Sequence, residues 1–330
     1  MPPAPETPEL PLLNDFQRGF PLLRRPFAEI GERCGLSEAQ VLGAYRAGLQ
    51  DGVVSRIGVV FAPNAVGAST LAAMAVPPSK IDAVAKLVSA QPEVNHNYER
   101  EHSVNLWFVA TAPSQDALRA ALERIARDTG TPVLALPLIE EYHIDLGFDL
   151  GGHAAPRAPH RPRAPTRLGA AERRLLAAVE SGFPLEPEPY AALGRAARMS
   201  EDEVIATLGR WLASGVARRV GVVLRHWKLG YTANAMAVWD VPDAEVAGTG
   251  MRLAGRPEVT LCYRRARHPP VWPYNLYCMI HGRGRKEVRA QLEALGKEEG
   301  LERYPHAVLF SRRAFKQRGA RYAEDGADDE

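Results

Sequence analysis

The segment RIGVV at residues 56–60 returns, with one conservative change, as RVGVV at residues 219–223. The same landmarks surround both copies in the same order: GFPL (19–22 and 182–185), PEV (92–94 and 257–259), Tyr-x-Arg (98–100 and 263–265) and Asn-Leu (105–106 and 275–276). Matches that keep their order across most of two half-chains identify a duplicated structural unit. We therefore interpret the chain as two copies of one fold.

Each copy opens with a compact helical segment. Apolar residues fall at helical spacing over residues 27–49, with a turn at 34–36 and Ser37 placed to cap the second helix. Residues 193–212 repeat the pattern. Each copy then breaks at a glycine and enters an apolar, β-rich run, at 53–61 and at 216–224. Helix, turn, helix and a strand pair is the order of a winged helix-turn-helix.

The rest of each copy alternates strands and helices in the order β-α-β-β-α-β, which is that of a ferredoxin-like domain. The elements are expected at 70–76, 80–90, 94–98, 104–110, 114–128 and 132–138 in the first copy, and at 232–238, 244–253, 259–263, 274–280, 286–299 and 306–311 in the second. The predicted fold class is α+β, a tandem duplication of a winged helix-turn-helix and a ferredoxin-like domain.

A chain of 330 residues is long enough for two or more ordinary cores. The predicted division is a first winged helix-turn-helix (14–65), a first ferredoxin-like domain (66–150), a Pro/Arg-rich linker (151–168), a second winged helix-turn-helix (169–228), a second ferredoxin-like domain (229–322) and an acidic tail (323–330).

The composition is that of an ordinary soluble protein, with 46% hydrophobic and 24% charged residues. No stretch approaches the roughly 20 apolar residues of a membrane span, and the N-terminus lacks the features of a secretory signal. The three cysteines are isolated, so neither a disulfide framework nor a zinc site is expected. These features predict a cytoplasmic protein. A net charge of +2 is too small to predict a nucleic-acid partner.

The hairpins of the two ferredoxin-like units hold the most unusual residues. Alternation along a strand places His96, Tyr98 and Arg100 on one face. A proton donor, an aromatic hydroxyl and a cation that can grip a carboxylate therefore lie together. The second copy keeps the tyrosine and the arginine but has Leu261 in place of His96. The duplicated sites are unequal, and we place the acid–base chemistry around the first.

A winged helix joined to a ferredoxin-like domain resembles the Lrp/AsnC family of regulators. A helix that reads DNA needs side chains that bond to base edges and a positive approach to phosphate. The corresponding helix of the second copy begins with Glu201-Asp202-Glu203, and that of the first begins with Glu38-Ala39-Gln40 and offers only Arg46 further on. Neither helix is equipped to read DNA, although acidic first turns also suit the helix dipole.

A more specific resemblance rests on the two hairpins. HNYEREHSVNLWF (96–108) and CYRRARHPPVWPYNLYCMIHG (262–282) resemble the signature runs of siroheme decarboxylases, the first of the D-type subunit and the second of the L-type subunit, fused in one chain. The resemblance covers nearly everything from Asp15 to Tyr322. It implies a carboxy-lyase that removes CO₂ from the C12 and C18 acetates of siroheme, giving 12,18-didecarboxysiroheme, a step toward haem d1.

The residue types suit that substrate. Siroheme carries eight carboxylates on a flat apolar macrocycle, and arginine can hold a carboxylate with two parallel hydrogen bonds. The expected substrate-binding residues are Arg56, Tyr98, Arg100, Arg219, Tyr263, Arg264, Arg265, Arg267, His268, Trp272 and Tyr274. The expected catalytic residue is His96 or His102, a general acid that protonates the tetrapyrrole or the methylene carbon.

Several alternatives stay open at this point. The ring is its own electron sink, so we expect no cofactor and no protein-bound metal, the iron arriving with siroheme. A pocket histidine is either a general acid or an axial iron ligand, and His268 either binds a carboxylate or ends a basic loop. The expected partner is siroheme, without nucleic acid or membrane, and the halves are expected to pair as a pseudo-dimer, with further oligomerisation left open. The competing functions are an Lrp/AsnC-like ligand-sensing regulator and a non-catalytic haem or siroheme carrier.

Overall fold

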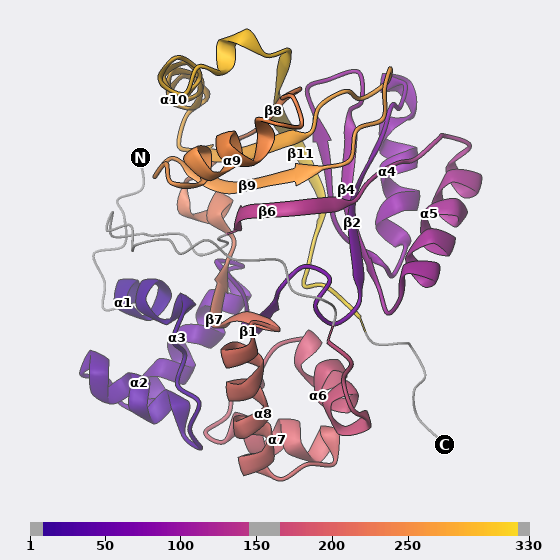
Figure 1. Ribbon diagram of the computed structural model, residues 1–330. Coiled ribbons are helices and arrows are strands. Elements are labelled where there is room, and N and C mark those ends of the chain that lie inside the picture. Colours follow the sequence, from indigo (N-terminus) through magenta and orange to yellow (C-terminus); the bar gives the residue numbers. More distant parts are fainter. Residues whose placement is uncertain (1–8, 145–165, 323–330) are drawn as a thin grey trace.

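The computed structural model describes residues 9–144 and 166–322, and it arranges them in two layers (Figure 1). The lower layer in this view holds the helix-turn-helix segments of both copies, and the upper layer holds both ferredoxin-like domains. The predicted acidic tail and all but the last three residues of the predicted linker lie outside the described residues.

The lower layer is built from short amphipathic helices that share one core. Its members are α1 (Glu9–Asn14), η1 (Asp15–Gln17), α2 (Pro26–Cys34) and α3 (Glu38–Gln50) from the first copy, and α6 (Ala170–Glu180), α7 (Pro189–Ala197) and α8 (Glu201–Ser214) from the second. Ser37 caps α3 as expected, in a capping box with Gln40, and Ser200 forms the same box with Glu203 on α8. Because α1 contributes the buried Leu12 to this core, the helical layer begins before the predicted boundary at residue 14.

The predicted strand pair of each wing is wrong in one respect. Each copy supplies a single strand, β1 (Val54–Phe61) or β7 (Ala217–Leu224), and these two pair antiparallel with Gly58 opposite Gly221. The pair therefore forms between the copies rather than within each one. Glycine is needed at 221 because a Cβ there would lie 2.3 Å from the Gln17 carbonyl oxygen. The repeated RIGVV and RVGVV segments are the two halves of this ribbon.

The upper layer confirms the ferredoxin-like order in both copies. The first contributes β2 (Ala68–Met74), η2 (Pro78–Lys80), α4 (Ile81–Ala90), β3 (Val94–Arg100), β4 (Leu106–Ala112), α5 (Gln115–Thr129), β5 (Leu134–Leu136) and β6 (Leu138–Ile144). The second contributes η3 (His226–Leu229), β8 (Ala233–Trp239), α9 (Val246–Ala254), β9 (Val259–Arg265), β10 (Leu276–Gly282), α10 (Arg285–Glu298), η4 (Leu301–Arg303) and β11 (His306–Gln317). The strands form one sheet in the order β5-β2-β4-β3-β11-β8-β10-β9-β6.

The last strand of each copy runs further than the sequence predicted and crosses to the other copy. The first part of β11 pairs with β8 of its own half, and its second part pairs with β3 of the first half. In the same way β5 pairs with β2, while β6 pairs with β9. Only Pro137 separates β5 from β6, so the two ends of the strand order meet and the sheet closes on itself. The expected intramolecular pseudo-dimer is thus formed by strand exchange.

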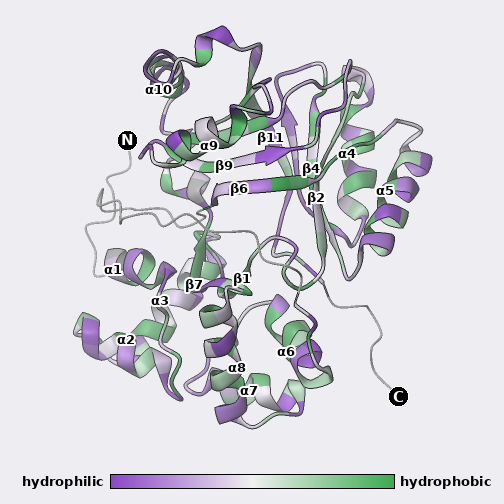
Figure 2. Ribbon diagram, viewed as in Figure 1, coloured by the Kyte–Doolittle hydropathy of each residue, from purple (hydrophilic) through white to green (hydrophobic). Residues whose placement is uncertain are grey.

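The closed sheet has an outer face under the helices and an inner face between the two halves. The outer cores hold the apolar sides of α4 and α5, and of α9 and α10; Figure 2 shows α5 with hydrophilic residues turned away from the strands. A further core draws on strands of both halves and lies on the inner face. In the described part of the chain, no helix has the length and apolar character that crossing a membrane requires.

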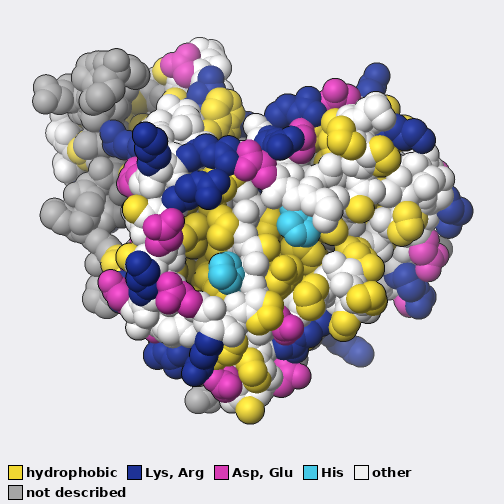
Figure 3. Space-filling model, turned by 90° about the horizontal axis from the view of Figure 1, so that it is seen from above, with side chains coloured by type: hydrophobic (Ala, Val, Ile, Leu, Met, Phe, Trp, Pro, Cys, Tyr) yellow, Lys and Arg dark blue, Asp and Glu magenta, His cyan; other side chains and the backbone are white. Residues whose placement is uncertain are grey.

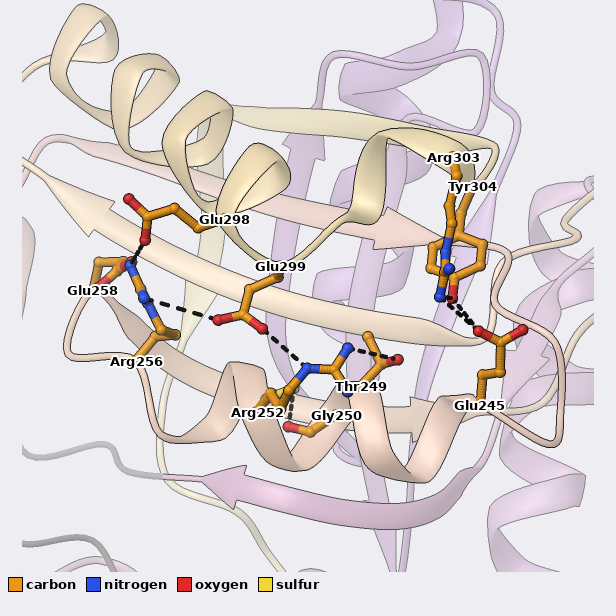
Figure 4. A network of polar contacts seen from close by, with 11 residues as sticks. Glu245, Thr249, Gly250, Arg252, Arg256, Glu258, Glu298, Glu299, Arg303 and Tyr304 are labelled. Atoms are coloured by element: carbon orange, nitrogen blue, oxygen red, sulfur yellow. Dashed lines mark hydrogen bonds and ion pairs between the residues drawn. The ribbon is translucent and has the colours of Figure 1, made fainter.

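Strand β6 of the first half is fixed against the helices of the second. The ring of Tyr142 lies on Gly250 of α9, where an added Cβ would come within 2.1 Å of it. Ion pairs on the same outer side, Arg252 with Glu299 at 3.1 Å and Arg303 with Glu245 at 2.6 Å, tie α9 to the end of α10 and the turn after it (Figure 4). The exchange of β6 therefore rests on close packing as well as on strand hydrogen bonds.

Replacing Gly250 with alanine tests this contact. The new methyl group must displace the Tyr142 ring, so we expect Gly250→Ala to lower the free energy of unfolding by about 1–3 kcal/mol in a urea titration. Gly248→Ala on the same helix is the control, since its Cβ would meet nothing nearer than Arg252 Nη1 at 3.9 Å. That variant should gain about 0.5–1 kcal/mol from helix propensity. Equal shifts in the two variants would contradict the packing role.

Candidate active site

The predicted row on β3 lies on the inner face of the closed sheet. Tyr98 stands directly opposite Trp107 of β4, a member of the inner core, so His96, Tyr98 and Arg100 all point between the halves. The Tyr98 hydroxyl is 3.2 Å from His96 Nδ1, within hydrogen-bonding distance, and the two rings stack at an interplanar angle of 18°. Sequence alternation therefore predicted this grouping correctly.

Arg100 is a buried cation held by neutral groups. Its side chain donates to Asn234 Oδ1 at 3.3 Å and to the Leu309 carbonyl at 3.2 Å, and its Nε meets no hydrogen-bond acceptor in the described part of the chain. Burial lowers the pKa of this guanidinium from its ordinary value. Among the residues that the structure describes, no ion pair involves Arg100. Such a group is costly to bury and is ready to receive an anion.

A second, altered row lies on β9. Tyr263 stands opposite Tyr277 of β10, both in the inner core, and Arg265 lies 4.5 Å above the Tyr263 ring. Arg265 donates to the Leu136 carbonyl at 2.7 Å. Arg100 of the first row in turn donates to Asn234 and Leu309, so each row is held by residues of the other half.

The two hairpin loops meet above this layer. The ring of His102 packs edge-on against Trp272 with 5.3 Å between centroids, and Tyr274 contacts the same indole at 4.9 Å. Trp272 is fully buried, donates to the Tyr277 hydroxyl at 2.6 Å, and packs on Trp107. The Trp272 indole thus forms part of the buried aromatic layer beneath the two hairpin loops.

His102 has a defined hydrogen-bonding state. Its Nδ1 accepts from the Val104 backbone N–H at 3.0 Å, so a neutral ring carries its hydrogen on Nε2. Burial lowers the pKa of His102 below its ordinary value. His268 in the facing loop donates through Nε2 to the Ala135 carbonyl at 2.6 Å, and its backbone pairs with that of Trp272. His268 therefore anchors the long loop to the first half.

The two candidate acids lie at different ends of the row. His96 is near the start of β3, and His102 lies two residues past its end, where the chain turns and the His102 N–H donates to the Arg100 carbonyl oxygen at 3.0 Å. Tyr98 and Arg100 lie between them. His96 therefore lies toward the helical layer, and His102 lies at the hairpin loops.

Four predicted arginines are not brought into these rows. Arg264 follows Tyr263 in the strand, so it faces the outer side, where it pairs with Asp243 at 2.7 Å. Arg267 is held by Asp240 and Asp243. Arg56 and Arg219 belong to the β1–β7 ribbon of the lower layer and donate to the Val59 and Val222 carbonyls. For these four the substrate-binding role remains a prediction.

Asn234 is a site residue that sequence reasoning missed. Its Oδ1 accepts from both Arg100 and Ser311, and so it holds the guanidinium in place. The signal was available, because Asn234 is the only polar residue in the otherwise apolar strand β8. Tyr277, whose hydroxyl accepts the hydrogen bond from the Trp272 N–H, was also missed. It lies in a largely apolar strand, where a tyrosine ring is expected to be part of the core.

The upper surface of the molecule combines apolar side chains, histidines and basic residues. Figure 3 shows a band of apolar side chains and two histidines across the middle of this face, with lysines and arginines along its edges, interspersed with acidic residues. An apolar centre with arginines around it suits a flat, polycarboxylated ligand. The geometry can therefore hold carboxylates with arginine and present a histidine to the same molecule.

Comparison with known proteins agrees with the fold. The chain matches the AsnC-like ligand binding domain at 65–143 and 228–316, and the siroheme decarboxylase NirDL-like HTH domain at 10–54 and 172–218. It is 46% identical to the siroheme decarboxylase NirDL subunit of Paracoccus denitrificans over 97% of this chain and 98% of that protein. A crystal structure of the siroheme decarboxylase NirDL superposes with a TM-score of 0.71 at 28% identity, covering 97% of this chain and 95% of that one.

A second crystal structure holds the siroheme decarboxylase NirDL in complex with an iron-uroporphyrin III analogue. It superposes with a TM-score of 0.69 at 28% identity, covering 96% of this chain and 93% of that one. The near-complete coverage by a relative of 46% identity, and the paired matches to both domain models, establish the family. The chain belongs to the siroheme decarboxylases of the NirDL type, enzymes of the carboxy-lyase class built on an Lrp/AsnC-like fold.

Proposed function

We propose that this chain removes CO₂ from the C12 and C18 acetates of siroheme, giving 12,18-didecarboxysiroheme on the way to haem d1. The observation that carries the proposal is Arg100, a buried guanidinium that meets no carboxylate in residues 9–144 and 166–322. A substrate carboxylate would supply the missing negative charge. The family to which the chain belongs supports the identity of that substrate.

The surroundings of Arg100 suit one edge of a tetrapyrrole. Tyr98 offers flat apolar surface with a polar tip, and Arg100 Cζ lies 5.8 Å from the centre of its ring. The low-dielectric inner layer strengthens any arginine–carboxylate hydrogen bond made there. A relative of the same type was crystallised with an iron-uroporphyrin III analogue, another polycarboxylated macrocycle.

Decarboxylation needs an electron sink and a proton. The bond between the methylene carbon and the carboxylate breaks, CO₂ leaves, and the electron pair passes into the conjugated ring. A proton then joins the methylene carbon, and the acetate becomes a methyl group. Arg100 holds a carboxylate so that the reacting acetate lies in a poorly hydrated place. His96, beside the Tyr98 hydroxyl, supplies the proton, and bulk water restores it.

Siroheme brings its own iron, so the proposed decarboxylation needs no metal from the chain. Among the described residues no group of three or more His, Cys, Asp or Glu side chains is arranged to hold a metal ion. His102, with Nδ1 occupied by the Val104 N–H, has only Nε2 to offer a substrate. As a protonated ring it would be an acid, and as a neutral ring without that hydrogen it would be an iron ligand.

The direct test is anaerobic incubation of the purified protein with siroheme and mass analysis of the product. We expect the loss of two CO₂ units. His96→Ala should lower turnover by about 10²–10⁴-fold, the range for a lost proton donor, while His306→Ala, at an exposed position on β11, should match the wild type. Siroheme bound but returned unchanged would instead identify a carrier. Salt-dependent binding of duplex DNA without turnover would identify a regulator.

Full turnover by both His96→Ala and His102→Ala would remove histidine acid catalysis from the proposal. Binding of siroheme by each variant has to be measured alongside, because a variant that no longer binds says nothing of the proton. If only the His102 variant is inactive, the reacting acetate lies at the hairpin end of the row rather than at the His96 end.

Removal of the Arg100 charge should separate stability from binding. An apolar side chain of similar length avoids the burial of an unpaired charge, so the free energy of unfolding of Arg100→Met should stay within about 1 kcal/mol of wild type or rise. Asn234 keeps its bond from Ser311. The dissociation constant for iron uroporphyrin III, from an absorbance titration, should rise about 10–100-fold. Arg252→Met, on the outer face, is the control and should bind normally.

The ionisation of His102 gives a pH test. Because burial lowers its pKa below the ordinary 6.5, the folded protein resists a proton that the unfolded chain accepts. Stability should therefore fall as the pH drops through 6.5 toward the folded pKa, and His102→Gln should lack this part of the pH dependence. Nitrogen-15 NMR should show the Nε2–H tautomer above that range. Titration of this ring at or above pH 6.5 would contradict the assignment.

A further inference from the structure

The two strand pairs made by exchange are equivalent position by position. Along β3 and β11, Arg100 lies opposite Ser311 and Tyr98 opposite Ala314. Along β9 and β6, Arg265 lies opposite Leu138 and Tyr263 opposite Glu141. Both ladders carry their register shifts at the same places. The residue beside each tyrosine can therefore be compared directly.

Among the described residues, this comparison reveals a carboxylate opposite the tyrosine of the second half and none opposite that of the first. Opposite Tyr98 the exchanged strand has Ala314, which leaves room and no charge. Opposite Tyr263 it has Glu141, whose side chain lies on the same face as the tyrosine. Glu141 is 6% exposed. The second half thus already contains a negative group where the first has a methyl group.

The cation that holds Glu141 has also changed between the copies. Arg218 forms a buried ion pair with it, the arginine side chain being 13% exposed and the carboxylate side chain 4%. Alignment of RIGVV with RVGVV puts Ser55 of the first copy in the place of Arg218. The Arg218–Glu141 ion pair of one half therefore corresponds to Ser55 and Ala314 in the other. Both members of the pair differ between the copies.

We propose that Glu141, held by Arg218, is an internal carboxylate that closes the second copy of the substrate site, so that each chain has one decarboxylation centre, around Tyr98 and Arg100. The inference rests on the proposed function. The half-buried Tyr98 and the buried Tyr263 agree with an open first site and a filled second one. Burial raises the pKa of Glu141, and Arg218 opposes that rise.

One centre has a consequence for the reaction. The C12 and C18 acetates belong to different pyrrole rings, so they cannot occupy the same position in one binding mode. After the first loss of CO₂ the macrocycle must turn or rebind before the second. A monodecarboxylated intermediate should therefore be seen free in solution under limiting enzyme, and excess unlabelled siroheme should compete with it.

The test is to exchange the two pairs. In an absorbance titration with iron uroporphyrin III, the wild-type protein should bind one molecule per chain. Ser55→Arg/Ala314→Glu should copy the closed site into the first half, weakening binding at least 100-fold and abolishing siroheme turnover. Changing both partners together avoids an unpaired buried charge. Glu140→Gln, next to Glu141 but bonded to Tyr142 on the outer side, is the control and should bind one molecule normally.

The converse variant, Glu141→Ala/Arg218→Ser, should raise the stoichiometry from one to two. Two molecules bound per wild-type chain would overturn the inference while leaving the proposed function intact, and so would undiminished binding and turnover by Ser55→Arg/Ala314→Glu. A wild-type protein that neither binds the probe nor consumes siroheme would instead defeat the proposed function. Because two molecules per wild-type chain would overturn the inference whether or not the variants fold, the proposal stays falsifiable without them.

Discussion

The hydrogen bonds that β3 and β9 make with the exchanged ends of β11 and β6 are the interaction on which the rest of the structure depends. A ferredoxin-like half with its own four strands would leave one of these strands as an edge with unpaired N–H and C=O groups. Each edge is instead covered by the end of the other half's last strand. The rows bearing Tyr98 and Tyr263 lie on these same two strands, so the candidate site exists only where the halves are joined.

Charge makes the exchange selective for unlike halves. Across the first junction Glu99 pairs with Arg313 at 2.6 Å. At the equivalent place in the second junction the signs are reversed, with Arg264 opposite Glu140. A pair of two first halves would set Glu99 against Glu140, and a pair of two second halves would set Arg264 against Arg313. Like charges so placed are destabilising, which favours the mixed pair even before the linker is considered.

The sequence was a good guide to whatever is local. Repeated landmarks identified the duplication, alternation placed His96, Tyr98 and Arg100 on one face, and Ser37 capped its helix as expected. The strand exchange could not be found in this way, because β6 reads LIEEYHI, and its acidic residues give no sign of a buried partner strand in the other half. The shared β1–β7 ribbon was missed for the same reason. Its two strands lie far apart in the chain, and neither segment alone indicates that the other is its partner.

The sequence did not show which of two consecutive residues in the basic cluster faces the inner layer. Arg264 and Arg265 are adjacent in sequence, yet they lie on opposite faces of β9, and only Arg265 reaches the inner layer. Composition marks the whole cluster as basic, but the pleat of the strand divides it. The same reasoning explains why Glu141 escaped notice beside Glu140. Which of two consecutive glutamates faces the inner layer depends on a register that only the partner strand defines.

Duplication explains how a symmetric scaffold came to hold an asymmetric site. Once both halves are in one chain, a change in one copy is not repeated in the other. His96 of one copy can thus correspond to Leu261 of the other, and Ala314 to Glu141, without any loss of the strand pairing that both junctions need. A homodimer would carry either two internal carboxylates or two unpaired buried arginines. In the fused chain, Arg100 at the proposed centre meets no carboxylate among residues 9–144 and 166–322, while the equivalent region of the other half has Glu141. The cost of a buried charge is thereby confined to the place where a substrate can offset it.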